Sequence, residues 1–188
     1  IDPSFMSRPM VHDASKFSPA SKSFLGTTIP GSLDGVTALG LALDRIAGHA
    51  NVGPFIGRQL IQRLVTSNPS PAYVGRVAAR FNDNGAGVRG DMLAVVKAVL
   101  LDAEARTDAA PVAADWGKVR EPVQRFIQWA RSFGATSPTD LWNIGDLSDP
   151  ATRLGQSPLR SPSVFNFFRP GYVPPNTAIG ALGLVAPE

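Results

Sequence analysis

The chain of 188 residues contains no cysteine and very little histidine or glutamate. The lack of cysteine excludes disulfides, thiolate zinc sites and catalytic thiols. Histidine occurs only at positions 12 and 49, and glutamate only at positions 104, 121 and 188, so few groups are available for acid–base chemistry. No apolar run approaches the roughly 18 residues that a membrane-spanning helix requires. The sequence therefore predicts no membrane span and no metal site, and we expect no cofactor.

The composition that remains is that of a globular protein. Hydrophobic residues make up 44% and charged residues 18% of the chain, which argues against a disordered protein. Residues 1–5 precede Met6 and resemble a cloning remnant, while residues 6–188 have the length of one domain. Residues 185–188 follow a Gly/Pro-rich run with no closing element. We therefore expect a single helical domain over 6–188 that is the carboxy-terminal part of a longer protein.

Apolar residues recur at spacings of three and four, which predicts amphipathic helices. No run alternates with a period of two for long enough to predict a strand. The expected fold class is all-α, an irregular helical bundle of about five main helices with a long Pro/Gly-rich amino-terminal lead-in and a carboxy-terminal wrapping tail. The main helices are expected from a Ser32 cap to about Gly48, from Asn51 or Gly53 to Asn68, from a Ser70 cap to Phe81, over 92–101 after an Asp91 cap, and from Glu121 to Gly134.

Three further segments have expected roles. The helix over 92–101 is apolar nearly all round, which predicts a place at the centre of the bundle. The stretch 107–115 is expected to be a loose connection. A short helix is expected over 163–168, within an aromatic segment that ends at Tyr172. This segment is expected to plug the helical core; the alternative is that its rings, beside Arg169, stack on bases or sugars.

Four residues are candidates for catalysis. His12 and Asp13 are adjacent in the lead-in, and His49 follows a helix end. Ser157 lies in Gly-Gln-Ser-Pro-Leu, which matches the first half of a nucleophile elbow but has Leu159 in place of the second glycine. With either histidine as base, Ser157 would act in a hydrolase of ester or glycosidic bonds. The structural alternatives are a turn serine, a locally hydrogen-bonded His12, and a His49 that interacts with the helix dipole.

The glycine-rich loop 82–91 is a candidate ligand site. Asp83 and Asp91 give it the character of a calcium loop, but the twelfth position is alanine where an EF-hand requires glutamate. Alternatively, its backbone N–H groups bind an anion beside Arg89 at the start of the next helix. Residues 51–101 carry a charge surplus of +4, which favours an anionic partner, acidic polysaccharide before nucleic acid. The structural alternative is that Asp91 caps the helix and the arginines are solvated.

Two long motifs resemble a known family. They are NVGPFIGRQLIQRLVTSNPSPAYVGRVAARFNDNGAGVRGDMLAVVKAVLLDAEAR and LGQSPLRSPSVFNFFRPGYVPP, and both are similar to the bacterial domain-of-unknown-function 1800 family. The similarity extends over nearly the whole chain from Met6. It implies a mostly helical protein. Members of the family often bear export signals and are often encoded beside another uncharacterised exported family, which implies a periplasmic or extracellular location.

The resemblance supplies no established catalytic residue, so it assigns no reaction. The expected function is that of a non-catalytic helical module of an exported bacterial protein that serves binding or assembly. Its partner would be the upstream part of its own chain or another exported protein. The alternatives are a hydrolase and an anion-binding protein.

Overall fold

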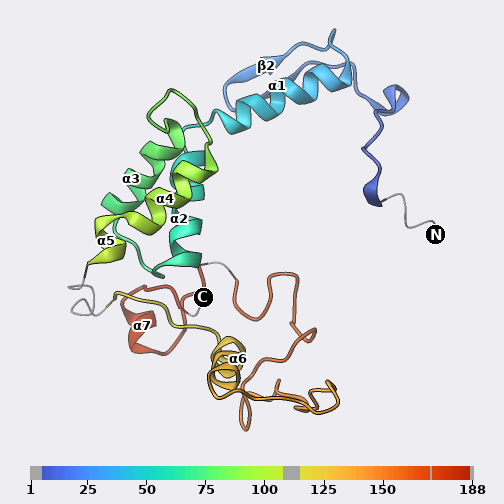
Figure 1. Cartoon of the computed structure of the whole chain (residues 1–188). Coiled ribbons are helices and arrows are strands. Elements are labelled where there is room, and N and C mark those ends of the chain that lie inside the picture. Colours follow the sequence, from blue (N-terminus) through green and yellow to red (C-terminus); the bar gives the residue numbers. More distant parts are fainter. Residues whose placement is uncertain (1–5, 108–114, 170, 187–188) are drawn as a thin grey trace. The chain divides into compact units, whose positions relative to one another are not determined.

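The computed structural model describes residues 6–107, 115–169 and 171–186 (Figure 1). The chain divides into two compact units, Ile1–Val52 and Gly53–Glu188. The expectation of a single domain over 6–188 stays a prediction. The suggested cloning remnant, residues 1–5, lies outside the described residues, as does nearly all of the connection expected over 107–115. The described residues are largely helical, which confirms the predicted fold class in its main feature.

The first unit contains a hairpin that the sequence does not predict. A short 3₁₀ turn (Ala14–Lys16) precedes strands β1 (Lys22–Phe24) and β2 (Thr27–Ile29), which pair antiparallel. Leu25 and Gly26 form the turn with φ angles of 47° and 72°, the positive values that a two-residue hairpin turn requires. The prediction of no strand is wrong, because strands of three residues are too short to display an alternating pattern.

Helix α1 (Gly35–Ala47) completes the first unit and packs against β2. Its cap is Asp34, whose Oδ1 accepts hydrogen bonds at 3.0 Å from the N–H groups of Val36 and Thr37. The expected Ser32 cap is therefore wrong. Ser32 and Asp34 are both good capping residues, and only the conformation of the chain selects between them. On the packed side of the helix, the side chain of Arg45 donates to the carbonyl of Leu25 in the hairpin turn.

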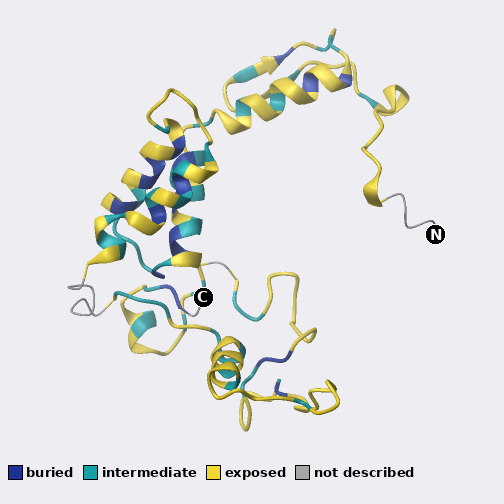
Figure 2. Ribbon diagram, in the orientation of Figure 1, coloured by how far each residue is buried: buried dark blue, intermediate teal, exposed yellow. Residues whose placement is uncertain are grey.

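The second unit is built on three helices, α2 (Val52–Leu64), α3 (Pro71–Asn82) and α4 (Met92–Leu101). The predicted caps are confirmed, since Ser70 Oγ accepts from the N–H of Tyr73 and Asp91 Oδ1 accepts from the first turn of α4. Figure 2 shows the buried residues gathered where these helices meet. The fully buried apolar side chains of this core are Ile61, Tyr73, Val77, Val95 and Val99.

Helix α2 ends at Leu64, earlier than the expected Asn68. Beyond its end, the N–H of Ser67 donates to the carbonyl of Gly117 at 2.9 Å, and Thr66 Oγ1 and the N–H of Gly117 are joined at 3.1 Å. The Lys118 ammonium donates to the carbonyls of Gln62 and Arg63 at the helix end. These bonds join residues that are at least 50 positions apart, so a local pattern could not have placed the end of the helix.

The predicted central position of 92–101 is wrong. In the described structure only Val95 and Val99 of α4 are buried, on the side that packs against α3. Leu93 is 65% exposed and Leu101 59% exposed. An apolar sequence all round a helix shows that every side could be buried, but not that enough neighbouring elements exist to cover every side. In Figure 2 much of the α4 ribbon is coloured as exposed or intermediate.

The remaining described elements are α5 (Ala103–Arg106), α6 (Pro122–Ser132) and α7 (Ala178–Ala181). Gly134, with φ of 62°, follows the end of α6 as predicted. The short helix expected over 163–168 is wrong, because that segment forms turns, whereas the unpredicted α7 is helical. Phe165 is 65% exposed, so it does not plug a core.

Candidate functional site

The adjacent candidates His12 and Asp13 both lie in the first unit and both have structural contacts. The His12 ring meets Phe17 edge-on with 5.7 Å between ring centres, and it lies against Gly35 so closely that a side chain at Gly35 would collide with it. Asp13 Oδ1 accepts from the N–H of Ser15 at 3.0 Å and from its hydroxyl at 2.6 Å. These two bonds hold the pKa of Asp13 below its ordinary value. Asp13 therefore stays ionised as the cap of a turn.

His49 lies in the turn between α1 and α2. Its N–H donates to the carbonyl of Ile46 at 3.1 Å, and its Nδ1 accepts from the N–H of Asn51 at 3.2 Å. The second bond requires an unprotonated Nδ1, so the imidazole helps to shape the turn.

Ser157 belongs to the second unit and is buried. Its carbonyl accepts from the N–H of Arg160 at 3.2 Å, as expected of a turn residue. The two histidines proposed as its base both belong to the first unit. In the described structure no strand leads directly into Ser157, as a nucleophile elbow would need. The hydrolase hypothesis stays a prediction.

The loop 82–91 binds its own side chains. Asp83 Oδ1 accepts from the N–H groups of Gly85 and Gly87 at 2.8 and 2.9 Å, and these bonds lower the pKa of Asp83. The side-chain oxygen of Asn84 accepts from the N–H of Ala86 at 2.9 Å. The N–H groups that an anion would use are therefore engaged within the loop.

The other two residues of this candidate site are also engaged. Asp91 Oδ2 accepts from the Asn84 amide at 2.8 Å, which lowers the pKa of Asp91, and its Oδ1 caps α4. The Arg89 guanidinium donates to Asn82 and lies 5.0 Å from the centre of the Phe81 ring. No group of three or more metal-ligating side chains occurs within the described residues. Both ligand hypotheses for the loop stay predictions.

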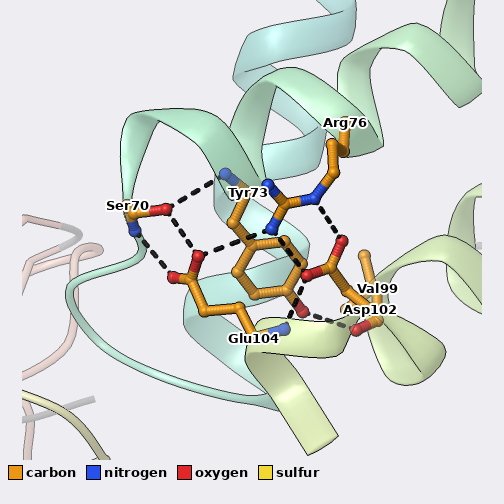
Figure 3. A network of polar contacts seen from close by, with 6 residues as sticks. All are labelled: Ser70, Tyr73, Arg76, Val99, Asp102 and Glu104. Carbon is orange, nitrogen blue, oxygen red and sulfur yellow. Dashed lines mark hydrogen bonds and ion pairs between the residues drawn. The ribbon is translucent and has the colours of Figure 1, made fainter. Parts of the chain in front are cut away.

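A polar network that the sequence does not predict joins α3 to the end of α4 and to α5 (Figure 3). The Glu104 carboxylate accepts from the Ser70 N–H at 3.0 Å and from the Ser70 hydroxyl. The oxygen of that hydroxyl in turn accepts from the N–H of Tyr73 and so caps α3. Arg76 forms a two-bonded ion pair with Asp102, with N···O distances of 2.8 and 2.7 Å. The capping role of Ser70 is visible in the sequence, but its partner Glu104 stands 34 residues away and carries no local signal.

The electrostatics of this network are those of a structural joint. Arg76 lowers the pKa of Asp102, and Asp102 raises that of Arg76. Burial, reinforced by the carboxylates of Asp102 and Glu104, raises the pKa of Tyr73 to about 12. Each shift moves its group further from neutral pH, whereas a general acid or base needs a pKa near the working pH. The network therefore holds helices together and offers no proton for catalysis.

An open groove of about 490 Å³ beside α6 is the binding site that the geometry favours. The rings of Phe126 and Trp129 lie side by side on α6, 6.2 Å apart and inclined by 25°. Trp129 is 57% exposed. The sequence predicts this helix, but apolar spacing does not show whether its apolar side is covered, so the site is not among the sequence-based candidates. We call this site the α6 groove; its lining residues are Val119, Arg120, Pro122, Arg125, Phe126, Trp129, Leu154 and Phe168.

The helices of the described chain do not reach the combination of length and apolar character needed to cross a bilayer. Comparison with curated proteins and with solved structures gives no match. The family model described as "Protein of unknown function (DUF1800)" matches residues 2–188. This match covers the two motifs that carried the resemblance in the sequence. The chain therefore belongs to the DUF1800 family.

Proposed function

We propose that this chain is a helical binding or assembly module of an exported bacterial protein, and that its partner is a polypeptide. One observation carries the proposal, namely an uncovered apolar surface on α1. Its members recur at spacings of three and four and so lie on one side of the helix. We call this surface the α1 stripe; it consists of Val36, Leu39, Leu43 and Ile46, which are 63%, 55%, 56% and 50% exposed.

The stripe is distinct from the side of α1 that packs within its own unit. The buried residues of α1 are the small residues Gly35, which lies against the His12 ring, and Ala38. The larger side chains of the stripe remain in solvent. Single exposed apolar residues are ordinary, but a contiguous apolar row on a helix marks an interaction surface. Full burial of each such side chain contributes about 1.5–3 kcal/mol, so a partner gains substantially by covering all four.

The form of the stripe favours a protein partner. Apolar side chains repeated over three turns of a helix are the usual anchors of a helix that docks into an apolar groove. The partner is either a further segment of a longer chain that contains this one or another exported protein. Export is supported by the resemblance to a family whose members often bear export signals.

Site-specific photocrosslinking in the producing bacterium tests this function. A photoreactive residue placed at Leu39 or Leu43 should form an adduct with a polypeptide. The same residue at Asp44, exposed on another side of α1, is the matched control and should form none. Adducts of equal yield at all three positions, or none at the stripe, would refute the proposal. Recovery of the native protein only from the cytoplasmic fraction would refute export.

A further inference from the structure

The α6 groove combines apolar walls with unpaired positive charge. Among the described residues that line it, the charged ones are Arg120 and Arg125. Arg120 Nη1 donates to the side-chain oxygen of Gln128 at 2.8 Å, and neither arginine makes an ion pair with a described residue. The nearby carboxylate of Glu121 accepts from the Gln156 amide at 2.7 Å and does not line the groove. No carboxylate among the described lining residues neutralises the two guanidinium groups, so the groove attracts a negatively charged ligand.

The lining also limits what hydrogen bonds a ligand can make. Guanidinium groups only donate, and the other lining side chains are aromatic or aliphatic. A neutral sugar presents hydroxyls that need acceptors as well as donors, so these side chains suit it poorly. A ligand with carboxylates beside apolar groups satisfies both features, because carboxylates only accept when ionised.

The ring geometry further separates a polypeptide from a nucleic acid. Binding of single strands relies on ring faces on which bases stack. Phe126 and Phe168 are half-buried, and the Phe168 ring packs against Tyr172 with 5.2 Å between ring centres, which leaves Trp129 as the exposed ring. Tryptophan and arginine beside aliphatic residues, without lysine, aspartate or glutamate, are instead typical of protein interfaces.

We propose that the α6 groove binds an acidic, apolar segment of a polypeptide, with aliphatic side chains against Phe126 and Trp129 and carboxylates at Arg120 and Arg125. This inference rests on the proposed function as an assembly module, and it adds a second surface and the chemistry of its partner. A guanidinium can grip a carboxylate with two parallel N–H···O bonds, which fixes the orientation of the segment. The aromatic rings supply most of the buried area.

Fluorescence anisotropy with a labelled helical peptide of leucine and glutamate tests the inference on the full chain. The Leu–Glu peptide should bind, and a Leu–Lys peptide of the same pattern should bind at least about tenfold more weakly. Trp129→Ala and Arg125→Glu should each weaken binding of the Leu–Glu peptide by about tenfold or more. Arg131→Glu, which makes the same charge change outside the groove on α6, should leave it within about twofold. Circular dichroism confirms that the variants remain folded.

Each contrary outcome identifies a different failure. Equal binding of the Leu–Lys peptide would show that the arginines select no charge, and equal binding of polyglutamate would show that the apolar wall contributes nothing. Preferential binding of oligothymidylate or polygalacturonate, sensitive to Trp129→Ala, would assign the groove to another class of polymer. Peptide binding that survives both groove variants would place it elsewhere, for example on the α1 stripe. None of these results alters the crosslinking test on α1, so the two proposals fail separately.

Discussion

The hydroxyl of Tyr73 donates a hydrogen bond to the backbone carbonyl of Val99. Val99 lies in the last turn of α4, where carbonyls have no partner within the helix. Tyr73 is fully buried, so this bond satisfies two polar groups that would otherwise be costly to remove from water. One side chain of α3 thus fills the core and also completes the end of the neighbouring helix.

The first prediction concerns ionisation of this phenol. The chain has two tyrosines, so Tyr172→Phe leaves Tyr73 as the only one. In that variant the tyrosinate absorbance should rise near pH 12, because burial raises the pKa of Tyr73 to about 12 from its ordinary value of 10.0. Since the folded pKa is raised, the stabilisation is fully present below pH 10.0 and is lost as the pH rises through about 12. If the Tyr73 phenol of the folded Tyr172→Phe variant ionised at the same pH as it does in the urea-unfolded variant, this account would be contradicted.

The second prediction concerns the contact between Ser70 and Glu104. Ser70→Ala removes the cap of α3 and one bond to Glu104, so it should lower the free energy of unfolding by about 1–2 kcal/mol. In a double-mutant cycle with Glu104→Ala, the double variant should lose about 0.5 kcal/mol or more less than the sum of the two single losses. The reason is that each single change already breaks the shared bond. Urea unfolding measures all four forms. Strict additivity would show that the two side chains act independently.

The third prediction compares two glycines in neighbouring helices. A β-carbon at Gly57 of α2 would lie 3.0 Å from Cγ1 of buried Val77, whereas one at Gly75 of α3 would meet nothing within 4 Å. Gly75→Ala should therefore raise the free energy of unfolding by about 0.5–1 kcal/mol through helix propensity alone. Gly57→Ala should lower it, since α2 and α3 would be forced apart. Equal gains in both variants would show that Val77 can move aside.

Local signals in the sequence were sufficient for several features of the fold. Ser70 and Asp91 cap the helices that they were expected to cap, because capping depends on a side chain and an N–H two or three residues away. The helix over 92–101 has the predicted bounds for the same reason. Features set by distant contacts could not be predicted. The end of α2 depends on bonds to Gly117, and the network around Glu104 joins residues far apart in the chain.

The candidate site was missed for a different physical reason. Apolar spacing shows which side of a helix is apolar, but it does not tell whether the protein's own core or another molecule covers that side. Phe126 and Trp129 on α6, like Leu39 and Leu43 on α1, belong to the apolar sides of amphipathic helices, and yet none of them is buried. The spacing therefore predicts the two helices but not the exposure of their apolar sides. The exposure of these sides is the observation on which the proposed binding function rests.

The fourth prediction tests this distinction on α4, where exposed and buried apolar residues are two positions apart. Leu93→Gln should change the free energy of unfolding by no more than about 0.5 kcal/mol, because Leu93 is 65% exposed and loses little packing. Val95→Ala should lower it by about 2 kcal/mol, since Val95 is fully buried and its two lost methyl groups leave a cavity. Urea unfolding of the isolated chain measures both variants. If Leu93→Gln is as damaging as Val95→Ala, then Leu93 is covered in solution, as a central α4 would require. A small effect for Leu93 alone would show that the isolated chain leaves this side of the helix open to a partner.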